Sequence, residues 1–263
     1  MAMEIKKAAV IGAGVMGSGI AAHIANAGIP VTLLDIVPKG AENRNAIAEG
    51  AVQRMLKTQP APLMSSRVAK LIAPGNTEDD LESLADCDWI VEAVLEDPKV
   101  KQNLYGRLEK VMKKGAVVSS NTSTIPLEIL TEGRSDAFKA GFMITHFFNP
   151  PRYMRLLEVV TGPKTGAKAA DAIRSFADER LGKGVVDCKD TPGFIANRIG
   201  NYWMTLGVNA AFDLGLTVEE ADAVAGRPMG VPKTGIFGLI DLVGLDLMPL
   251  SLIHISEPTR PTT

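Results

Sequence analysis

Cysteine is scarce in this sequence, and its basic residues are not clustered. The chain has 263 residues but only two cysteines, Cys87 and Cys188, which are far apart and belong to no CxxC pattern. This argues against a disulfide framework and a metal site, and it fits a reducing compartment. The formal net charge is -2 and no lysine- or arginine-rich block occurs. We expect no nucleic-acid partner, because phosphate binding needs a concentrated basic surface.

Long apolar runs and a leader segment are also missing. No apolar stretch reaches the length that a helix needs to cross a bilayer. The N-terminus enters an apolar segment almost at once, without the regions of a targeting peptide. We therefore expect a cytoplasmic protein with no membrane partner. Hydrophobic residues make up 46% of the chain, which is ordinary for a globular protein with a core.

Short apolar runs alternate with helical segments in the first 190 residues. The expected strands are residues 6–11, 31–35, 89–93, 116–119, 142–146, 157–161 and 184–187. Helical patterns occupy residues 16–27, 39–57, 98–112 and 166–181, with a short helix after Pro126. This alternation predicts an α/β fold with a Rossmann-type, doubly wound, mostly parallel sheet that is covered on both faces. The pattern becomes helical after residue 190, where we place a domain boundary.

A glycine-rich loop follows the first predicted strand. Gly12, Gly14 and Gly17 match the pattern G-x-G-x-x-G, with a strand before it and a helix after it. Gly12 allows the tight turn, Gly14 lets the backbone approach a pyrophosphate, and Gly17 lets the helix pack on the strand. Asp35 lies 18 residues after Gly17, where it would accept hydrogen bonds from ribose hydroxyls and repel a 2′-phosphate. The loop therefore predicts NAD as cofactor; the alternative is a turn without a ligand and a solvated aspartate.

His146 is the candidate base for an oxidation. Of the other two histidines, His23 lies within the first helix and His254 in an unusual tail. His146 ends an apolar strand, and ligands of doubly wound sheets bind at such strand ends. Oxidation of an alcohol requires removal of the hydroxyl proton, which suits a histidine. Glu158, in the next strand, would hold the imidazole; the alternative is that Glu158 faces solvent.

These segments together resemble the 3-hydroxyacyl-CoA dehydrogenase family. The resemblance rests on GAGVMG at 12–17, LLDI at 33–36, VEAVLEDPKVK at 91–101, SSNTST at 119–124, HFFNPP at 146–151 with Glu158, and DTPGFIANR at 190–198. They occur in the family's order and spacing over residues 5–249. The residues of several segments are most similar to those of large bacterial proteins that combine two activities of fatty acid oxidation.

The resemblance implies a function and a set of site residues. The function is NAD-dependent oxidation of (S)-3-hydroxyacyl-CoA to 3-oxoacyl-CoA in fatty acid β-oxidation. His146 would be the base and Glu158 its partner, and Ser123 and Asn197 would lie at the 3-oxygen of the substrate. The NAD site would include Met16, Asp35, Val94, Glu96, Lys101, Ser123 and Asn149. Without the resemblance, Lys101 would be assigned to a solvated helix face.

The end of the chain departs from the family. We expect an NAD-binding domain at 1–190, the start of a truncated all-helical dehydrogenase domain at 191–249, and a non-native tail at 250–263 that resembles a translated sequencing adapter. The full-length protein is expected to be a homodimer or part of a larger multifunctional chain. Two alternatives remain open. One is an inert, truncated NAD-binding module, and the other is a dehydrogenase of free hydroxy acids, although those usually carry a lysine base.

Overall fold

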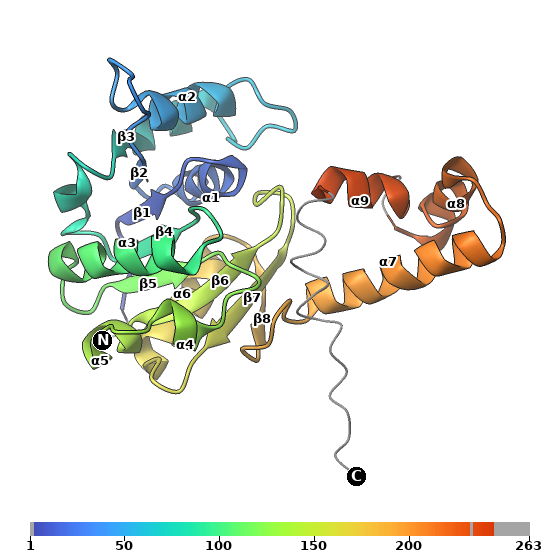
Figure 1. Cartoon of the computed structure of the whole chain (residues 1–263). Coiled ribbons are helices and arrows are strands. Elements are labelled where there is room, and N and C mark those ends of the chain that lie inside the picture. Colours follow the sequence, from blue (N-terminus) through green and yellow to red (C-terminus); the bar gives the residue numbers. More distant parts are fainter. Residues whose placement is uncertain (1–2, 232–233, 245–263) are drawn as a thin grey trace, which may run out of the picture. The chain divides into compact units, whose positions relative to one another are not determined.

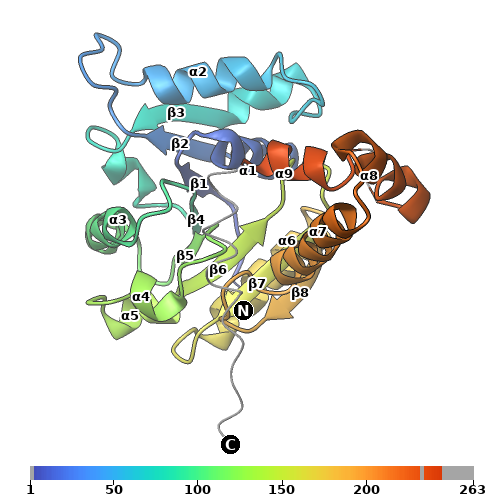
Figure 2. The same cartoon turned by 45° about the vertical axis from the view of Figure 1, so that its right-hand side comes forward.

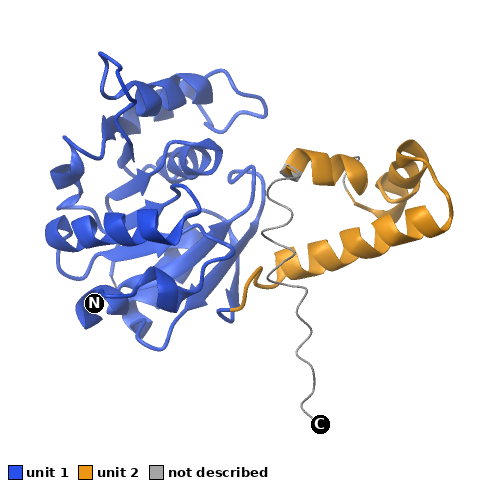
Figure 3. Ribbon diagram, in the orientation of Figure 1, with its two compact units in different colours: residues 1–190 blue, residues 191–263 orange. Residues whose placement is uncertain are grey.

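The chain divides into two compact units. The computed structural model describes residues 3–231 and 234–244, and the units are residues 1–190 and 191–263 (Figure 3). The tail predicted at 250–263 lies outside the described residues. Among the described residues, no helix combines the length and apolar character needed to cross a membrane.

The first unit is built on one eight-stranded sheet with the order β3-β2-β1-β4-β5-β6-β7-β8 (Figure 1). Neighbouring strands run parallel except where β6 meets β7, so the expected mostly parallel, Rossmann-type sheet is confirmed. The strand order reverses between β1 and β4, and ligands of such sheets bind at this reversal. The strands are β1 Ala8–Ile11, β2 Val31–Asp35, β3 Ile72–Asn76, β4 Trp89–Glu92, β5 Val117–Ser120, β6 Phe142–Phe147, β7 Leu156–Thr161 and β8 Gly184–Cys188.

Helices cover both faces of this sheet (Figure 2). The α-helices of the first unit are α1 Val15–Asn26, α2 Ala46–Met55, α3 Pro98–Val111, α4 Leu127–Leu130, α5 Asp136–Ala140 and α6 Ala167–Glu179. Short 3-10 helices η1 Ser66–Leu71 and η2 Leu81–Leu84 join them. The start of α3 follows from its sequence: Asp97 accepts the Val100 N–H as N-cap, and Pro98 occupies the first turn.

Aromatic side chains mark the two halves of the core. On one face, Trp89 of β4 contacts Phe147 of β6 and Phe176 of α6 within the cluster formed with α1 and α2. On the other face, Tyr105 of α3 packs against Phe138 of α5, and both rings contact Phe142. Both faces of the strands are therefore buried, which explains why their sequences are continuously apolar rather than alternating.

Two predicted features of the fold differ from the structure. The helix expected to begin at residue 39 begins only at Ala46, because the segment before it contains Pro38 and Gly40, which has a φ of 72°. Strand β3 was not expected, because its sequence contains Pro74 and Gly75. Its place at the edge explains the difference: β3 pairs only with β2, so the proline leaves no ladder bond unmade.

The second unit is helical over its described residues. Its elements are α7 Ala196–Asp213, α8 Val218–Val224, η3 Arg227–Met229 and α9 Phe237–Val243. Thr217 and Glu220 form a capping box that starts α8. Met204, Ala225 and Ile236 form a small buried cluster. The helical character predicted after residue 190 is therefore confirmed.

Candidate active site

The glycine loop joins β1 to α1 beneath the loop that follows β4. Gly12 has a φ of 101°, and a Cβ on it would collide with the carbonyl oxygen of Ala93. A Cβ on Gly17 would overlap the carbonyl oxygen of Gly12, so the first turn of α1 packs directly on the end of β1. Gly14 differs, because a Cβ there would meet no atom within 4 Å. The loop is thus closed on the side of the sheet and open at Gly14, in front of the helix N-terminus.

Asp35, at the carboxyl end of β2, faces this loop. Its Oδ2 accepts the Ala13 N–H at 2.5 Å and its Oδ1 accepts the Ile36 N–H at 2.7 Å. These two bonds hold the carboxylate beside the glycine loop while the side chain stays partly exposed. A carboxylate held in this way can accept hydrogen bonds from a diol and disfavours a neighbouring phosphate.

A buried ion cluster lies below the loop after β4. The Lys101 ammonium is 2.7 Å from Glu92 Oε1 and 3.1 Å from Glu96 Oε2, and the Lys101 side chain is only 1% exposed. Lys101 is therefore not on a solvated helix face. Glu92, at the end of β4, is fully buried and also accepts the hydroxyls of Tyr105 and Ser120 and the N–H of Val94. Glu92 is the common acceptor of this cluster. It was not predicted as a site residue, because it lies inside an apolar strand.

Glu96 joins the cluster to the loop after β5. It accepts hydrogen bonds from the hydroxyls of Thr122 and Thr124. Burial raises the pKa of Glu96, but the Lys101 ammonium and the two threonine hydroxyls outweigh burial, so its pKa lies below the ordinary value. Glu96 is therefore a carboxylate at neutral pH, and it fixes the loop that carries Ser123.

Asn121 connects this loop to the histidine strand. Its backbone N–H donates to the Glu92 carbonyl, and its Oδ1 accepts the Phe147 N–H at 2.9 Å. The carboxyl ends of β4, β5 and β6 are thus tied together. Ser123 lies two residues beyond Asn121 and is half-buried. Asn121 lies in the quoted run SSNTST, but its anchoring role could not be predicted without the order of the strands.

His146 and Glu158 lie opposite each other in the antiparallel pair of β6 and β7. His146 Nδ1 is 2.8 Å from Glu158 Oε2, and the two side chains are 10% and 1% exposed. Glu158 therefore faces the imidazole and not solvent. When Nδ1 carries the proton and donates it to the carboxylate, the proton-accepting lone pair belongs to Nε2. A buried carboxylate at this distance also stabilises the imidazolium that forms when Nε2 takes a proton.

The segment after His146 leads to a cavity beside the glycine loop. The cavity has a volume of about 500 Å³ and is bounded by Asn149–Arg152, by Gly14–Gly19 of the loop and α1, and by Arg54 and its neighbours in α2. Asn149 is exposed, and Met16 is half-buried in the first turn of α1, against the core. The first unit therefore gathers Gly14, Asn149 and two arginines, Arg54 and Arg152, around one hollow.

Asn197 belongs to the second unit. It occupies the second position of α7 and is half-buried. The other predicted site residues all lie in the first unit.

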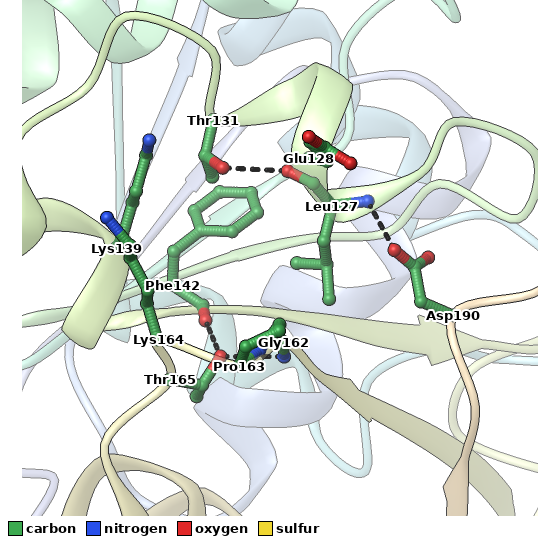
Figure 4. Close-up of a pocket in the computed structure, with 10 residues that line it drawn as sticks. All are labelled: Leu127, Glu128, Thr131, Lys139, Phe142, Gly162, Pro163, Lys164, Thr165 and Asp190. Carbon is green, nitrogen blue, oxygen red and sulfur yellow. Dashed lines mark hydrogen bonds between the residues drawn. The ribbon is translucent and has the colours of Figure 1, made fainter.

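A second cavity lies at the opposite edge of the sheet, where β6 begins and β7 ends (Figure 4). It has a volume of about 620 Å³ and contains none of the predicted site residues. Its side chains serve the fold: Asp190 accepts the Leu127 N–H at 2.9 Å, and Thr165 donates to the Phe142 carbonyl. Asp190, at the end of the first unit, is thereby tied to the segment that follows the Ser123 loop.

Comparison with known families identifies the protein. Residues 7–191 match the model described as 3-hydroxyacyl-CoA dehydrogenase, NAD binding domain. The chain belongs to the 3-hydroxyacyl-CoA dehydrogenase family. Residues 193–260 match the model for the C-terminal domain of the same family. This dehydrogenase is therefore an NAD-dependent oxidoreductase, as its glycine loop and its histidine motif predicted.

Individual relatives agree with the family. A probable 3-hydroxyacyl-CoA dehydrogenase of Deinococcus radiodurans is 49% identical over 94% of this chain and 71% of its own length. A putative fatty acid oxidation complex trifunctional enzyme of Rickettsia felis is 44% identical, over 95% of this chain but only 35% of its own length. The crystal structure of Mycobacterium tuberculosis FadB2 has a TM-score of 0.82 and 31% identity, covering 96% of this chain and 87% of that one. The chain thus spans about a third of the longer relative.

The residues of this dehydrogenase fit NAD. The space in front of Gly14, which a Cβ would partly fill, lies at the N-terminus of α1, where the first N–H groups have no partner within the helix. A pyrophosphate suits that position because the helix dipole favours negative charge there. Asp35 supplies the acceptor that a ribose diol needs.

Replacement of Asp35 tests cofactor choice. We expect Asp35→Asn to weaken NAD binding and strengthen NADP binding. The ratio of the two affinities should fall by roughly tenfold or more, which corresponds to about 1.4 kcal/mol. The reason is that the amide keeps the size of the side chain but removes the charge that repels a 2′-phosphate. Fluorescence titration with NADH and NADPH measures both affinities. Glu42→Gln, an exposed change in the segment after β2, is the matched control. Equal affinity of the unmodified protein for both cofactors would rule out this role.

Proposed function

We propose that this dehydrogenase oxidises (S)-3-hydroxyacyl-CoA to 3-oxoacyl-CoA, with NAD as the hydride acceptor. The observation that carries this proposal is the His146–Glu158 pair, joined at 2.8 Å at the edge of the sheet where the glycine loop and Asp35 also lie. The reaction removes a proton from the hydroxyl oxygen and a hydride from the same carbon. A buried histidine–carboxylate pair is suited to the first of these two transfers.

His146 and Glu158 divide the proton chemistry between them. Nε2 of His146 takes the hydroxyl proton, and Nδ1 remains hydrogen-bonded to Glu158. Because Glu158 is 1% exposed, little water competes for its charge, and it stabilises the imidazolium strongly. NAD, when bound, supplies the hydride-accepting carbon. In the reverse direction the imidazolium returns its proton to the carbonyl oxygen of the substrate.

The remaining site residues position the reactants. We assign Ser123 and Asn197 to the 3-oxygen of the substrate, because a hydroxyl and an amide can donate to the developing carbonyl. We assign Met16, Val94, Glu96, Ser123 and Asn149 to the surroundings of NAD. Lys101 acts there through Glu92 and Glu96, which hold the loop with Val94 and Glu96 in place. In this assignment, residues 1–190 are the NAD-binding domain and residues 191–249 are the start of the helical dehydrogenase domain.

The cavity beside the glycine loop supports an acyl-CoA as substrate. It is large enough for part of an extended ligand, and Arg54 and Arg152 line it. Guanidinium groups favour the phosphates of a CoA handle over an uncharged substrate. Fatty acid oxidation is named for several relatives, which favours that pathway and a larger multifunctional chain. We assign the protein to the cytoplasm, and a homodimer is the alternative to the larger chain.

The test is a spectrophotometric assay with three substrates. Acetoacetyl-CoA should oxidise NADH, and (S)-3-hydroxybutyryl-CoA should reduce NAD. Free 3-hydroxybutyrate at the same concentration should give no reaction, because it lacks the CoA handle. Turnover of the free acid with none of the thioester would favour a hydroxy-acid dehydrogenase. NADH binding without turnover of any substrate would leave an inert nucleotide-binding module.

A further inference from the structure

Lys183 is a buried cation that takes no part in the proton transfer between substrate and His146. It precedes β8 and is 3% exposed. Its ammonium donates to the carbonyl oxygen of Met154 at 2.7 Å and to that of Pro151. It also lies 5.6 Å from the centre of the Phe147 ring. Within the part of the chain that the structure describes, Lys183 makes no ion pair with a carboxylate. Its charge is therefore directed at the backbone of one turn.

That turn, residues 148–155, follows His146 and bounds the cavity beside the glycine loop. Other contacts besides Lys183 also hold it, among them the Gly184 N–H, which donates to the Arg155 carbonyl at 2.8 Å. Arg152 donates to the Ala61 carbonyl at 2.6 Å, and the Tyr153 hydroxyl donates to the same oxygen at 2.9 Å. Pro151 packs so closely on α1 that a Cβ on Gly19 would lie 2.8 Å from its Cδ. The turn is thus held between α1 on one side and the Lys183 ammonium on another.

The surroundings of Lys183 disfavour its charged form. Burial lowers the pKa of Lys183 to about 8. The groups that face this region are His23 of α1 and Arg152 of the turn. Burial, together with the charges of Lys183 and Arg152, lowers the pKa of His23 to about 4. His23 is therefore neutral at physiological pH. The desolvation of this ammonium disfavours its charged form, and its bonds to the Pro151 and Met154 carbonyls oppose that effect.

We propose that Lys183 is a positioning residue of the dehydrogenase: it holds the turn 148–155 against α1 and so sets the position of Asn149 and the shape of the cavity for cofactor and substrate. This rests on the proposed function of the site. Lys183 contacts neither His146 nor Glu158, which the β6–β7 pairing holds independently. Loss of Lys183 should therefore affect binding more than the proton transfer itself.

Kinetics of Lys183→Met provide the first test. Methionine has a similar length but no donor, so two buried carbonyl groups lose their partner and the turn shifts. We expect the KM values for NADH and acetoacetyl-CoA to rise roughly tenfold or more, with kcat changed less, because small displacements of binding groups have large effects. Lys164→Met, which removes a 57% exposed lysine that pairs with Asp136 and not with the turn, should leave both parameters unchanged. Unchanged KM values in Lys183→Met would overturn the proposal.

The pH dependence separates positioning from a purely structural role. As pH rises through about 8, Lys183 loses its proton and the bonds to Pro151 and Met154 lose their charge, so kcat/KM for the oxidation of (S)-3-hydroxybutyryl-CoA, in which His146 accepts a proton, should fall. Stability should move the other way. The unfolded chain holds this proton to higher pH than the folded chain does, so the free energy of unfolding contributed by Lys183 rises between about pH 8 and the ordinary lysine pKa. Both trends should disappear in Lys183→Met; an unaltered alkaline limb in that variant would contradict the proposal.

Gly19→Ala is a second variant that moves the same turn without touching Lys183. Its new Cβ would meet Pro151 at 2.8 Å and push the turn away from α1. We expect higher KM values and a retained alkaline limb, and unchanged kinetics would count against the proposal even if Lys183→Met failed to fold. If the unmodified protein has no turnover, the proposed function fails. NADH affinity then tests Lys183 separately, because the cavity shares Gly14 with the cofactor loop. Equal NADH affinity with and without Lys183 would overturn its role.

Discussion

His146→Ala is expected to lower kcat by roughly 10²–10⁴-fold, the typical contribution of a general base. NADH should still bind with near-normal affinity, because the glycine loop follows β1 and Asp35 ends β2, and neither depends on the imidazole. Steady-state kinetics with acetoacetyl-CoA and a fluorescence titration with NADH measure the two quantities. Turnover within a few-fold of normal would show that another group takes the proton.

Replacement of Glu158, the partner of His146, should also lower kcat. Glu158→Gln keeps the size of the side chain and an acceptor for Nδ1, but it removes the buried charge that stabilises the imidazolium. We expect a loss of at least about 10-fold in kcat, and up to the roughly 10⁴-fold known when the carboxylate of a histidine–carboxylate pair becomes an amide. Glu128→Gln removes an exposed carboxylate from α4 and should leave kcat unchanged. A loss in both variants would point to a general effect of charge and not to the pair.

Lys101→Met is expected to have the largest effect on stability. It removes the cation between Glu92, which is fully buried, and Glu96. An uncompensated buried carboxylate typically lowers the free energy of unfolding by about 3–5 kcal/mol. NADH affinity should fall as well, since the loop with Val94 and Glu96 loses its anchor. Urea denaturation at neutral pH measures the first effect and titration the second.

Two further variants make this prediction specific. Lys113→Met breaks the ion pair with Asp88, in which the lysine is 39% exposed, and should lower the free energy of unfolding by no more than about 1 kcal/mol. Glu92→Gln combined with Lys101→Met should recover part of the loss, because the unpaired charge is then gone. If Lys101→Met and Lys113→Met unfold at the same urea concentration, the buried cluster does not have the importance assigned to it.

The parts of the site that the sequence predicted are those encoded within short segments. Gly12, Gly14 and Gly17 act through backbone geometry inside one turn, so their spacing is enough to identify the loop. Asp35 ends the strand that comes next in the chain. His146 and Glu158 are 12 residues apart in consecutive strands, and strands that follow each other in sequence commonly pair. In each case the contact depends on local structure.

The contacts that the sequence did not predict join residues whose proximity depends on the order of the strands. In the sequence, Glu92 is a single polar residue in an apolar strand. In the structure, β5 and α3 place the hydroxyls of Ser120 and Tyr105 against it. Asn121 reaches Phe147 only because β5 and β6 are neighbours. The edge strand β3 was missed for the same kind of reason, since its Pro74 is tolerated only where no further strand pairs with β2.

The sequence by itself determined the doubly wound α/β class, the cofactor loop, the acid that follows it, and the histidine with its carboxylate. These features depend on backbone propensities and on short spacings along the chain, which can be read without knowing the tertiary structure. The tertiary structure alone decided which charges are buried. Lys101 and Lys183 are both ordinary lysines in the sequence, yet one lies between two carboxylates and the other donates to two carbonyl groups away from any carboxylate partner described. The free energy of a charge depends on the solvent and partners around it, and those are set only when distant segments come together.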